Sequence, residues 1–274
     1  MAIHSFLRAE RGDPDWQFSP EDYFEKEFKI IDAAIVELDE GQSDQVVLRQ
    51  IPTEKELLAK HLKIFVRSDA TLDINIINEL EAELQQVFLY DVYLKPGAAL
   101  NLGIYAKNGK LNKHIIQVYQ EDSSIFSSYG LIYNDCAGDT EVVTKIMHQG
   151  ANSVSSQLFM GIAGGESQTV FQSITVAEPE GVNSNIGIES SNLVIDPTGR
   201  CYSKPETFIN ADFVTSGYAS ETSNLNFEKL SYLESRGIEY HAARKLIIST
   251  FRDQAINLIP HENIRDEIKE MYAD

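Results

Sequence analysis

Short stretches in which every second residue is apolar follow one another along the middle of this sequence, and they constrain the fold more than any other feature. The pattern begins near Leu62 and stops near Asn226. A period of two residues predicts β-strands, because successive side chains of a strand point to opposite faces. The alternating sets are Leu62, Ile64 and Val66; Leu72, Ile74 and Ile76; Phe88, Tyr90, Val92 and Leu94; Leu100, Leu102 and Ile104; Ile116 and Val118; Val142, Thr144 and Ile146; Leu158, Met160 and Ile162; Val170, Ile174 and Val176; Ile186 and Ile188; and Leu193 and Ile195.

The segments between these strands are short and rich in turn residues, such as Pro96-Gly97, Asn108-Gly109 and Gly164-Gly165. A long series of strands without intervening helices excludes a doubly wound α/β sheet and leaves a sandwich, a closed barrel or a stacked solenoid. Gly-Ala pairs at 97–98 and 150–151 bound strands in a similar way. Corners of this kind favour a chain that coils repeatedly in one direction, each coil resting on its neighbour.

Helical patterns flank the strand region. Ser19 and Pro20 suggest the start of a helix, because serine is a good N-cap and proline suits the first helical position. An apolar stripe then predicts an amphipathic helix over residues 20–39, ended by Gly41. The stripe consists of Phe24, Phe28, Ile31, Ile35 and Leu38.

Three further helices are predicted after Asn226. Their apolar positions are Leu230 and Leu233; Ala243, Leu246, Ile247, Thr250 and Phe251; and Ile264, Ile268 and Met271. Gly237 provides a stop for the first, since glycine readily adopts the left-handed conformation that ends helices. The predicted organisation is therefore an N-terminal lead-in with a helix (1–59), a β body (60–225) and a C-terminal helical subdomain (226–274).

The charge of the chain excludes several classes of partner. Lys plus Arg is 23 and Asp plus Glu is 42, so the formal charge is −19, which repels nucleic acid and anionic membranes. No apolar run approaches the length of a membrane helix, and the first eleven residues have no signal-peptide core. Two cysteines are too few for a disulfide framework. These features predict a soluble cytoplasmic protein.

The segment Lys204–Phe251 resembles the C-terminal core of the SufB/SufD family of iron–sulfur cluster assembly proteins. The matching residues are Lys204-Pro205, Ile209, Ala211-Asp212, Val214, Leu230, Tyr232-Leu233, Ser235-Arg236-Gly237-Ile238, Ala243-Arg244-Lys245-Leu246 and Phe251. A weaker likeness extends upstream through His148, Ser153, Phe171, Val176 and Asn192-Leu193, so that the resemblance covers roughly residues 60–274. Family members usually carry a longer N-terminal helical domain than the 60 residues found here.

The resemblance implies a right-handed parallel β-helix with a C-terminal helical subdomain. It also implies pairing with a SufB-type paralogue or a second copy, and docking of the helices onto SufC, an ABC-type ATPase. This sequence has no G-x-x-x-x-G-K-[ST] loop, so ATP chemistry is expected in the partner and this chain is not expected to be an enzyme. The expected docking residues are Tyr232, Leu233, Arg236, Gly237, Ala243, Leu246, Ile247 and Phe251.

The cluster-linked positions of the family are replaced in this chain. Gly199 stands at the position of a SufB cysteine, Tyr218 at that of a SufD histidine, and Ala219 at that of a SufB glutamate. Cys201 and Glu221 each lie two residues further on. Because a shift of two keeps a strand residue on the same face, they form a candidate displaced cluster or metal site. The alternative is a buried cysteine and a solvated glutamate.

Other candidate ligands have structural explanations. His148 matches a histidine often seen in the family and is a candidate metal ligand, although a hydrogen-bonded structural role is favoured. Cys136 lies in a turn-like stretch, which favours a structural role. The other histidines show no metal-ligand spacing.

Three functions follow from these observations. The first is a non-catalytic SufD-like scaffold subunit that recruits SufC, and the replaced cluster-linked positions favour it. The second is a sole SufB/SufD-type scaffold that holds a transient iron–sulfur cluster as a homodimer. The third is a β-helix carbohydrate-active or binding protein, which leaves the Lys204–Phe251 match unexplained. None of these has a permanently bound cofactor.

Overall fold

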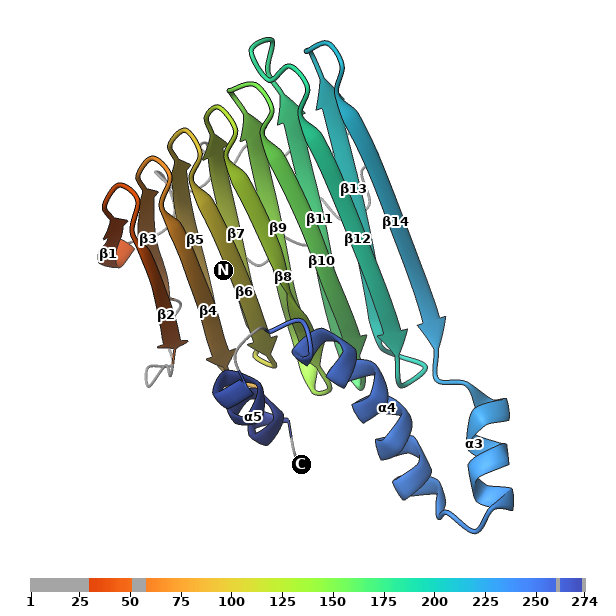
Figure 1. The fold of residues 1–274 in the computed structure, drawn as a ribbon. Helices are drawn as coiled ribbons and strands as arrows, with labels where there is room; N and C mark the ends of the chain where they lie inside the picture. Colours follow the sequence, from red (N-terminus) through yellow and green to blue (C-terminus); the bar gives the residue numbers. More distant parts are fainter. Residues whose placement is uncertain (1–29, 51–57, 260–261, 273–274) are drawn as a thin grey trace, which may run out of the picture.

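The chain folds into a solenoid of parallel β-strands followed by three helices (Figure 1). The computed structural model describes residues 30–50, 58–259 and 262–272. The strands are β1 (Ile30–Leu38), β2 (Ser43–Gln50), β3 (Leu58–Val66), β4 (Thr71–Glu79), β5 (Gln85–Leu94), β6 (Ala99–Lys107), β7 (Leu111–Gln120), β8 (Ile125–Asn134), β9 (Ala137–His148), β10 (Val154–Ala163), β11 (Glu166–Ala177), β12 (Asn185–Val194), β13 (Arg200–Ile209) and β14 (Thr215–Asn224).

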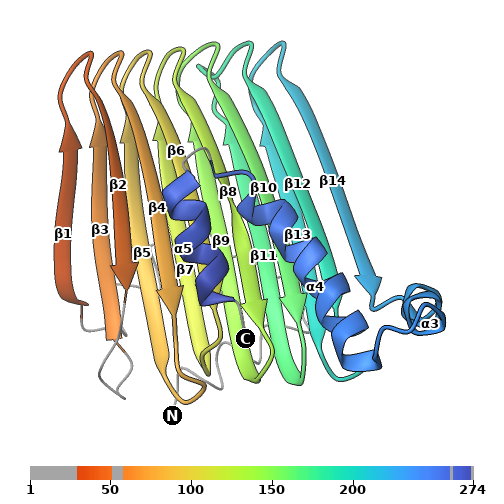
Figure 2. The same ribbon diagram turned by 60° about the horizontal axis from the view of Figure 1, so that its bottom comes forward.

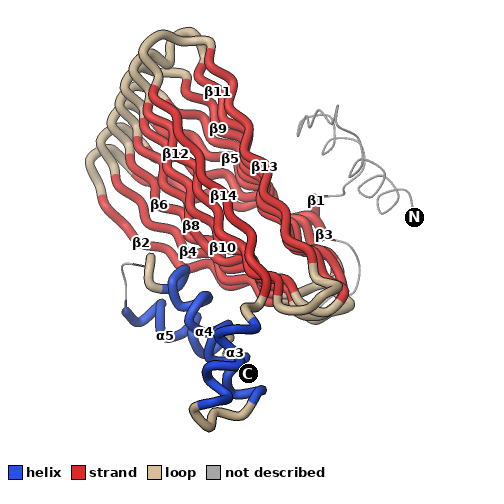
Figure 3. Tube along the Cα trace, turned by 90° about the vertical axis from the view of Figure 1, so that its right-hand side faces the viewer, coloured by secondary structure: helices blue, strands red, loops and turns tan. Residues whose placement is uncertain are grey.

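Odd-numbered and even-numbered strands form two separate seven-stranded sheets. Each strand pairs in parallel with the strand two further along the sequence, so that the chain alternates between the sheets and advances by one coil at a time. Figure 3 shows the two sheets lying face to face as the two walls of a flattened coil. This arrangement confirms the predicted parallel β-helix.

The corners between the sheets explain how the coils stay in register. Asp69, Gly97, Ser123 and Asn152 occupy equivalent corners of successive coils, and all four have positive φ angles between 56° and 72°. Backbone hydrogen bonds join each corner to the next, for example from Asp69 N to Pro96 O. At Gly97 a Cβ atom would lie 2.1 Å from Asp69 Oδ1, so a larger residue there would require the Asp69 side chain to move.

The interior between the two sheets is the main core. Its first coils are filled by aliphatic and aromatic side chains that are at most 1% exposed, including Ile64, Val66, Leu72, Ile74, Phe88, Tyr90, Leu100 and Leu102. These residues are the alternating positions of the sequence. Removing apolar surface from water contributes about 25 cal/mol per Å². The burial of these side chains is therefore the dominant stabilising contribution in these coils.

The predicted helix over residues 20–39 is wrong where the structure describes it, because β1 occupies Ile30–Leu38 and pairs in parallel with β3. Phe24 and Phe28 lie outside the described residues. Val36 and Leu38 alternate toward the core cluster, whereas Ile35 is 68% exposed. The period of two in this segment therefore decides the structure, and pairing with β3 overrides the helical spacing. Strands consequently begin about thirty residues earlier than the predicted boundary at residue 60.

The predicted C-terminal helices are confirmed as α3 (Phe227–Ser235), α4 (Tyr240–Ile256) and α5 (Glu262–Met271). Asn226 caps α3 by accepting a hydrogen bond from Lys229 N, and Gly237 follows the helix with φ +85°. Figure 2 shows α4 and α5 lying across the outer face of the even-numbered sheet. Ile256, Ile264 and Ile268 pack there in a second apolar cluster with residues such as Tyr105 and Leu131.

Within the described residues, none of the helices is long and apolar enough to cross a membrane.

Candidate functional site

The last coil of the solenoid, formed by β13, β14 and the turn between them, differs from every coil before it. Every residue of β14 is exposed. β14 pairs with β12 on one side, and it is the edge strand of its sheet on the other. Exposed edges of this length favour pairing with another chain, and natural proteins usually protect them with charges or proline. The sequence of β14, TSGYASETSN, has no lysine, arginine or proline.

Large apolar side chains gather around this uncovered coil. Tyr218 is 74% exposed although its register partner Ile188 belongs to the core, because none of the described residues forms a further coil over it. Phe213, in the turn between the two strands, is 82% exposed. Tyr202, Phe208 and Ile209 on β13 are each about half exposed, at 49%, 54% and 48%. Edge strand and apolar side chains together form a surface that we name the open end.

Cys201 lies on β13 and points into the solenoid. Its register partner on β11 is Thr169, which is 1% exposed and donates a hydrogen bond from its hydroxyl to Cys201 Sγ at 3.2 Å. The carbonyl of Leu193 lies 3.8 Å from the same sulfur. Burial raises the pKa of the Cys201 thiol, although the Thr169 hydrogen bond partly opposes this effect. Cys201 is therefore a free thiol kept in its neutral form.

The structure does not bring the side chains of Cys201 and Glu221 together. Glu221 pairs with Ser191 across β12 and β14, and its carboxylate accepts the Ser191 hydroxyl at 3.1 Å. This position lies on the outer face of the even-numbered sheet, whereas Cys201 faces the interior. An even spacing between two residues places their side chains on the same face only within one strand. It does not predict their relative facing across the turn from β13 to β14, because the two strands belong to different sheets.

Polar residues that the sequence analysis did not identify surround the interior near Cys201. The Asn192 side-chain amide donates to Ser203 Oγ at 2.9 Å and to Thr222 Oγ1 at 3.2 Å, joining β12, β13 and β14. Ser203 and Thr222 lie at the inward-facing parity of their strands. That parity could have identified them, but neither residue type by itself suggests a ligand.

His148 and Cys136 occupy structural positions. His148 is fully buried, and its Nδ1 and Nε2 atoms lie 2.7 and 2.9 Å from the hydroxyls of Ser153 and Ser155. Burial lowers the pKa of His148 to about 4, so the ring is neutral near pH 7. Cys136 lies in a turn, with its Sγ 3.5 Å from Asp135 Oδ1, and burial raises its pKa. Both geometries favour the structural interpretations.

An apolar groove separates α3 from α4 beside the end of β14. Its volume is about 610 Å³, and Tyr232, Leu233, Leu246 and Phe251 contribute to its lining. Tyr232 and Leu246 are 58% and 47% exposed. The remaining predicted docking residues differ in accessibility. Ile247 also lines the groove, Arg236 stacks over the Tyr232 ring, Gly237 is exposed in the turn, and Ala243 is fully buried against Leu225 and Leu230.

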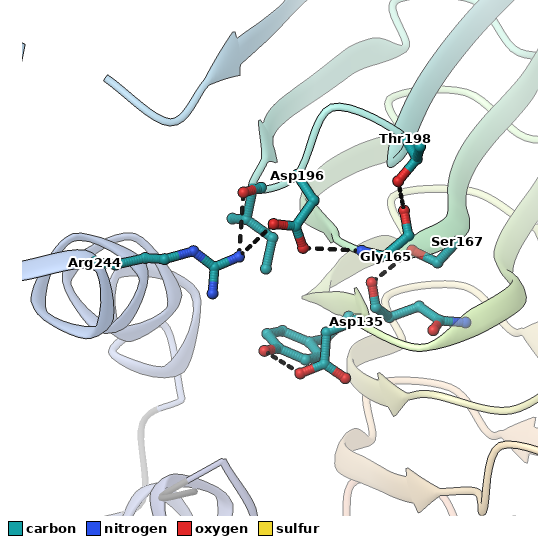
Figure 4. A network of polar contacts seen from close by, with 9 residues as sticks. Asp135, Gly165, Ser167, Asp196, Thr198 and Arg244 are labelled. Carbon is teal, nitrogen blue, oxygen red and sulfur yellow. Dashed lines mark hydrogen bonds and ion pairs between the residues drawn. The ribbon is translucent and has the colours of Figure 1, made fainter. Parts of the chain in front are cut away.

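A polar junction fixes α4 to the solenoid on the other side of that helix (Figure 4). Arg244 Nη2 donates to Asp196 Oδ1 at 2.8 Å and to the carbonyl of Ile195 at 3.2 Å. Asp196 also accepts the backbone N–H of Gly165 from the preceding coil. The turn between β12 and β13, which leads directly into Cys201, is thus held by the helix and by its neighbouring coil.

Comparison with known proteins gives a consistent result. The model of the SufBD core domain of the SUF system for iron–sulfur cluster assembly matches residues 24–251, more than half of the chain. An iron–sulfur cluster assembly SufBD family protein of Synechocystis is 25% identical over 62% of this chain and 37% of its own length. Chloroplastic protein ABCI7 of Arabidopsis thaliana is 27% identical over 60% and 34%, respectively. Iron–sulfur cluster assembly protein SufD of Bacillus subtilis is 29% identical over 46% and 29%. The matched segments span about a third of the length of these relatives.

Proposed function

This chain belongs to the SufBD family of iron–sulfur cluster assembly proteins, and we propose that it is a non-catalytic, SufD-like scaffold subunit. In this role the open end pairs with a SufB-type paralogue or with a second copy of the chain. The groove between α3 and α4 binds a SufC-type ATPase.

The observation that carries the proposal is the uncovered last coil. An edge strand of ten exposed residues without lysine or proline, which carries Tyr218 and follows Phe213, is unfavourable in water unless a partner covers it. A partner strand would satisfy the free backbone groups of β14. The apolar side chains beside it would supply the anchors that dominate binding energy in interfaces.

The side chains around Cys201 favour the role of a scaffold subunit over binding of a cluster by this chain alone. Iron–sulfur clusters are bound mainly by several thiolates, with imidazole in some sites. The neighbours of Cys201 are instead the hydroxyls of Thr169 and Ser203 and the amide of Asn192. In this proposal the cluster is cargo, assembled with ligands that a partner chain supplies.

A sole scaffold that holds the cluster as a homodimer is the second candidate. Cys201 lies in the last coil, so pairing of two open ends would bring two copies of this thiol to the same end of the solenoid. Anaerobic purification with and without a SufC-type ATPase, followed by iron and sulfide analysis, separates the candidates. A brown homodimer with stoichiometric iron favours the sole scaffold, whereas an iron-free chain that assembles with a SufB-type paralogue favours the SufD-like subunit.

Docking of the ATPase is tested best by point substitutions. Deleting residues 228–274 would also remove Ile256, Ile264 and Ile268, which cover the outer face of the even-numbered sheet, so the deletion would perturb the solenoid itself. Tyr232→Asp and Leu246→Asp place charges at exposed positions of the groove without removing buried contacts. We expect each to weaken ATPase binding at least tenfold, with Ile125→Asp on β8 as a control of similar exposure. Unchanged affinity in both groove variants would move the docking site elsewhere.

A further inference from the structure

The outer face of the odd-numbered sheet is buried, although the described helices pack elsewhere. The helices α4 and α5 lie on the outer face of the even-numbered sheet, where they form the second apolar cluster (Figure 2). The remaining helix, α3, packs against α4. Side chains on the outer face of the odd-numbered sheet would therefore be open to solvent if the described elements alone covered the solenoid.

Two isoleucines show that this face is not open to solvent. Ile115 on β7 and Ile125 on β8 both point outward, because the next residue of each strand, Ile116 or Phe126, belongs to the main core. Each strand also has a neighbour on both sides within its sheet. Ile125, on the even-numbered sheet, is 45% exposed, whereas Ile115, on the odd-numbered sheet, is 3% exposed. A cover over the odd-numbered sheet accounts for this difference.

The covered area extends over four neighbouring strands. Val87 on β5, Val143 on β9 and Gln172 on β11 point outward and are at most 2% exposed. Gln172 Nε2 has no hydrogen-bond partner, which water would supply on an open surface. Lys113 on β7 and Glu141 on β9 form an ion pair at 2.9 Å on this face, and they are only 4% and 6% exposed. Water is therefore excluded from the middle of the face.

The cover must come from outside the described residues, which leaves residues 1–29, 51–57, 260–261 and 273–274. The last two segments adjoin α5, on the other sheet. Residues 51–57 join β2 to β3, and a seven-residue connection fixed at both ends reaches out and back by at most about 15 Å. The strand β11 lies four intervals from β3, or roughly 19 Å. Residues 1–29 are the segment that can cover β5 to β11.

The sequence and length of residues 1–29 suit this role. The segment leads directly into β1, which is the edge strand of the odd-numbered sheet. β11 lies five intervals from β1, or roughly 24 Å, and 29 residues span about 44 Å even at the rise of an α-helix. Aromatic side chains bury large apolar areas, and six of these residues are aromatic: Phe6, Trp16, Phe18, Tyr23, Phe24 and Phe28.

We propose that residues 1–29 fold back from β1 and cover the outer face of the odd-numbered sheet within the same chain. The aromatic side chains of the segment pack on Val87, Ile115 and Val143, and a carbonyl of the segment accepts the Gln172 amide. An uncovered apolar face of this size would favour association with other proteins. The cover therefore directs association to other surfaces of the solenoid. This inference does not depend on the proposed scaffold role.

Trp16 makes the cover measurable, because it is the single tryptophan of the chain and lies in this segment. Acrylamide quenching of Trp16 fluorescence in the full chain tests the proposal, with a synthetic peptide of residues 1–29 as the uncovered reference. We expect the quenching constant of the full chain to be several-fold lower than that of the peptide. Equal quenching constants in the chain and the peptide would overturn the proposal.

Three substitutions locate the cover. Ile115→Asp places a charge beneath it and should raise the quenching constant toward that of the peptide. Phe24→Asp should have the same effect without any change in the sheet, so it decides the question if Ile115→Asp does not fold. Ile125→Asp is the matched control on the other sheet, and its quenching constant should equal that of the wild type. Far-ultraviolet circular dichroism verifies the fold of each variant.

Three results of these measurements would overturn the proposal. The first is an unchanged quenching constant in both Ile115→Asp and Phe24→Asp. The second is an equal rise in Ile115→Asp and Ile125→Asp, because the effect would then not be specific to the odd-numbered sheet. The third is protection of Trp16 that is lost on dilution, which would assign the cover to a second copy of the chain.

Discussion

The early coils formed by β3 to β6 and the last coil of the solenoid share one backbone plan but differ in what fills and covers them. In the coils of β3 to β6 the interior is almost entirely aliphatic and aromatic. From β7 onward polar side chains enter the interior, beginning with His114, which stacks on Phe88 and bonds to the Tyr90 hydroxyl. In the last coil the interior is open. The backbone plan therefore does not require one kind of core. The early coils are stabilised by burial, whereas the later coils depend on satisfied hydrogen bonds and on whatever covers the open end.

The polar interior is hydrogen-bonded in a connected way. The Thr144 hydroxyl donates to Gln157 Oε1 at 2.6 Å, and Gln157 Nε2 donates to Ser173 Oγ at 2.7 Å. A neighbouring network joins His148 to Ser153 and Ser184. Buried polar groups are costly when unpaired, so these networks make the later coils sensitive to the loss of single atoms.

The largest effect on stability is expected in the early coils. Leu102 is fully buried in the main core, and Leu102→Ala should lower the free energy of unfolding by about 3 kcal/mol, through lost burial and a residual cavity. Urea denaturation measures this loss. Ile125→Ala removes a side chain that is 45% exposed and should cost less than about 1 kcal/mol. Equal losses of unfolding free energy in the two variants would contradict the description of the early coils as a closely packed apolar core.

Acidification should act on the later coils through His148. Its pKa is lowered from 6.5 to about 4 in the folded protein, so folding favours the neutral ring. The associated stability is present above pH 6.5 and is lost as the pH falls from there toward 4. A shift of this size corresponds to on the order of 3 kcal/mol.

His148→Asn removes this titration and keeps an amide that can bind a serine hydroxyl. The difference in unfolding free energy between wild type and variant should therefore shrink as the pH falls from 7 toward 4. Other titrating groups, including the buried His114, are common to both proteins and cancel in this difference. If this difference in unfolding free energy stayed constant between pH 7 and pH 4, protonation of His148 would not contribute to the loss of stability in acid.

Loss of the Gln157 amide should have a somewhat smaller effect. Gln157→Leu keeps the approximate size of the side chain but leaves the Thr144 and Ser173 hydroxyls without this partner. We expect a loss of about 2 kcal/mol in the free energy of unfolding. Ser156→Ala, at an exposed position of the same strand, should change stability by less than about 0.5 kcal/mol. A more stable Gln157→Leu variant would indicate that the later coils tolerate an apolar core.

The same comparison explains what the sequence could predict. The early coils follow strict alternation of apolar residues, and their strands and core positions were predicted from it. β14 carries few apolar residues because it faces no core that would require them, so period-two patterning does not identify it. The helix predicted over 20–39 failed over residues 30–38 because the spacing of Ile31, Ile35 and Leu38 also suits a helix, whereas the segment pairs with β3 and directs Val36 and Leu38 toward the core.

The candidate site was predicted less well than the fold. The sequence predicted that Cys201 and Glu221 form one site, but the direction in which residues of two strands in different sheets face depends on the geometry of the turn between the strands. The hydroxyl and amide groups around Cys201 come from strands up to 32 residues away in sequence. These groups meet only because of the register between successive coils, and no local sequence pattern predicts that register. The resemblance of Lys204–Phe251 to the SufB/SufD family supplied the functional class that residue patterns alone did not.

The smallest effect on unfolding is expected at the open end, where substitution should instead change assembly. Tyr218→Lys replaces a side chain that is 74% exposed, so it should alter the unfolding free energy of the isolated chain by less than about 0.5 kcal/mol. A buried charge in a paired interface would be strongly unfavourable. Assembly and stability should therefore separate in this one variant.

Sedimentation velocity of wild type and Tyr218→Lys, each alone and mixed with a SufB-type paralogue, tests the central claim that the open end is an interface. The account predicts that the wild type forms a complex in at least one of the two samples, above the mass of the 30.8 kDa chain. It also predicts that Tyr218→Lys remains a monomer in both samples while keeping its fold. A wild type that sediments as a monomer in both samples, or a variant that assembles as well as the wild type, would contradict it.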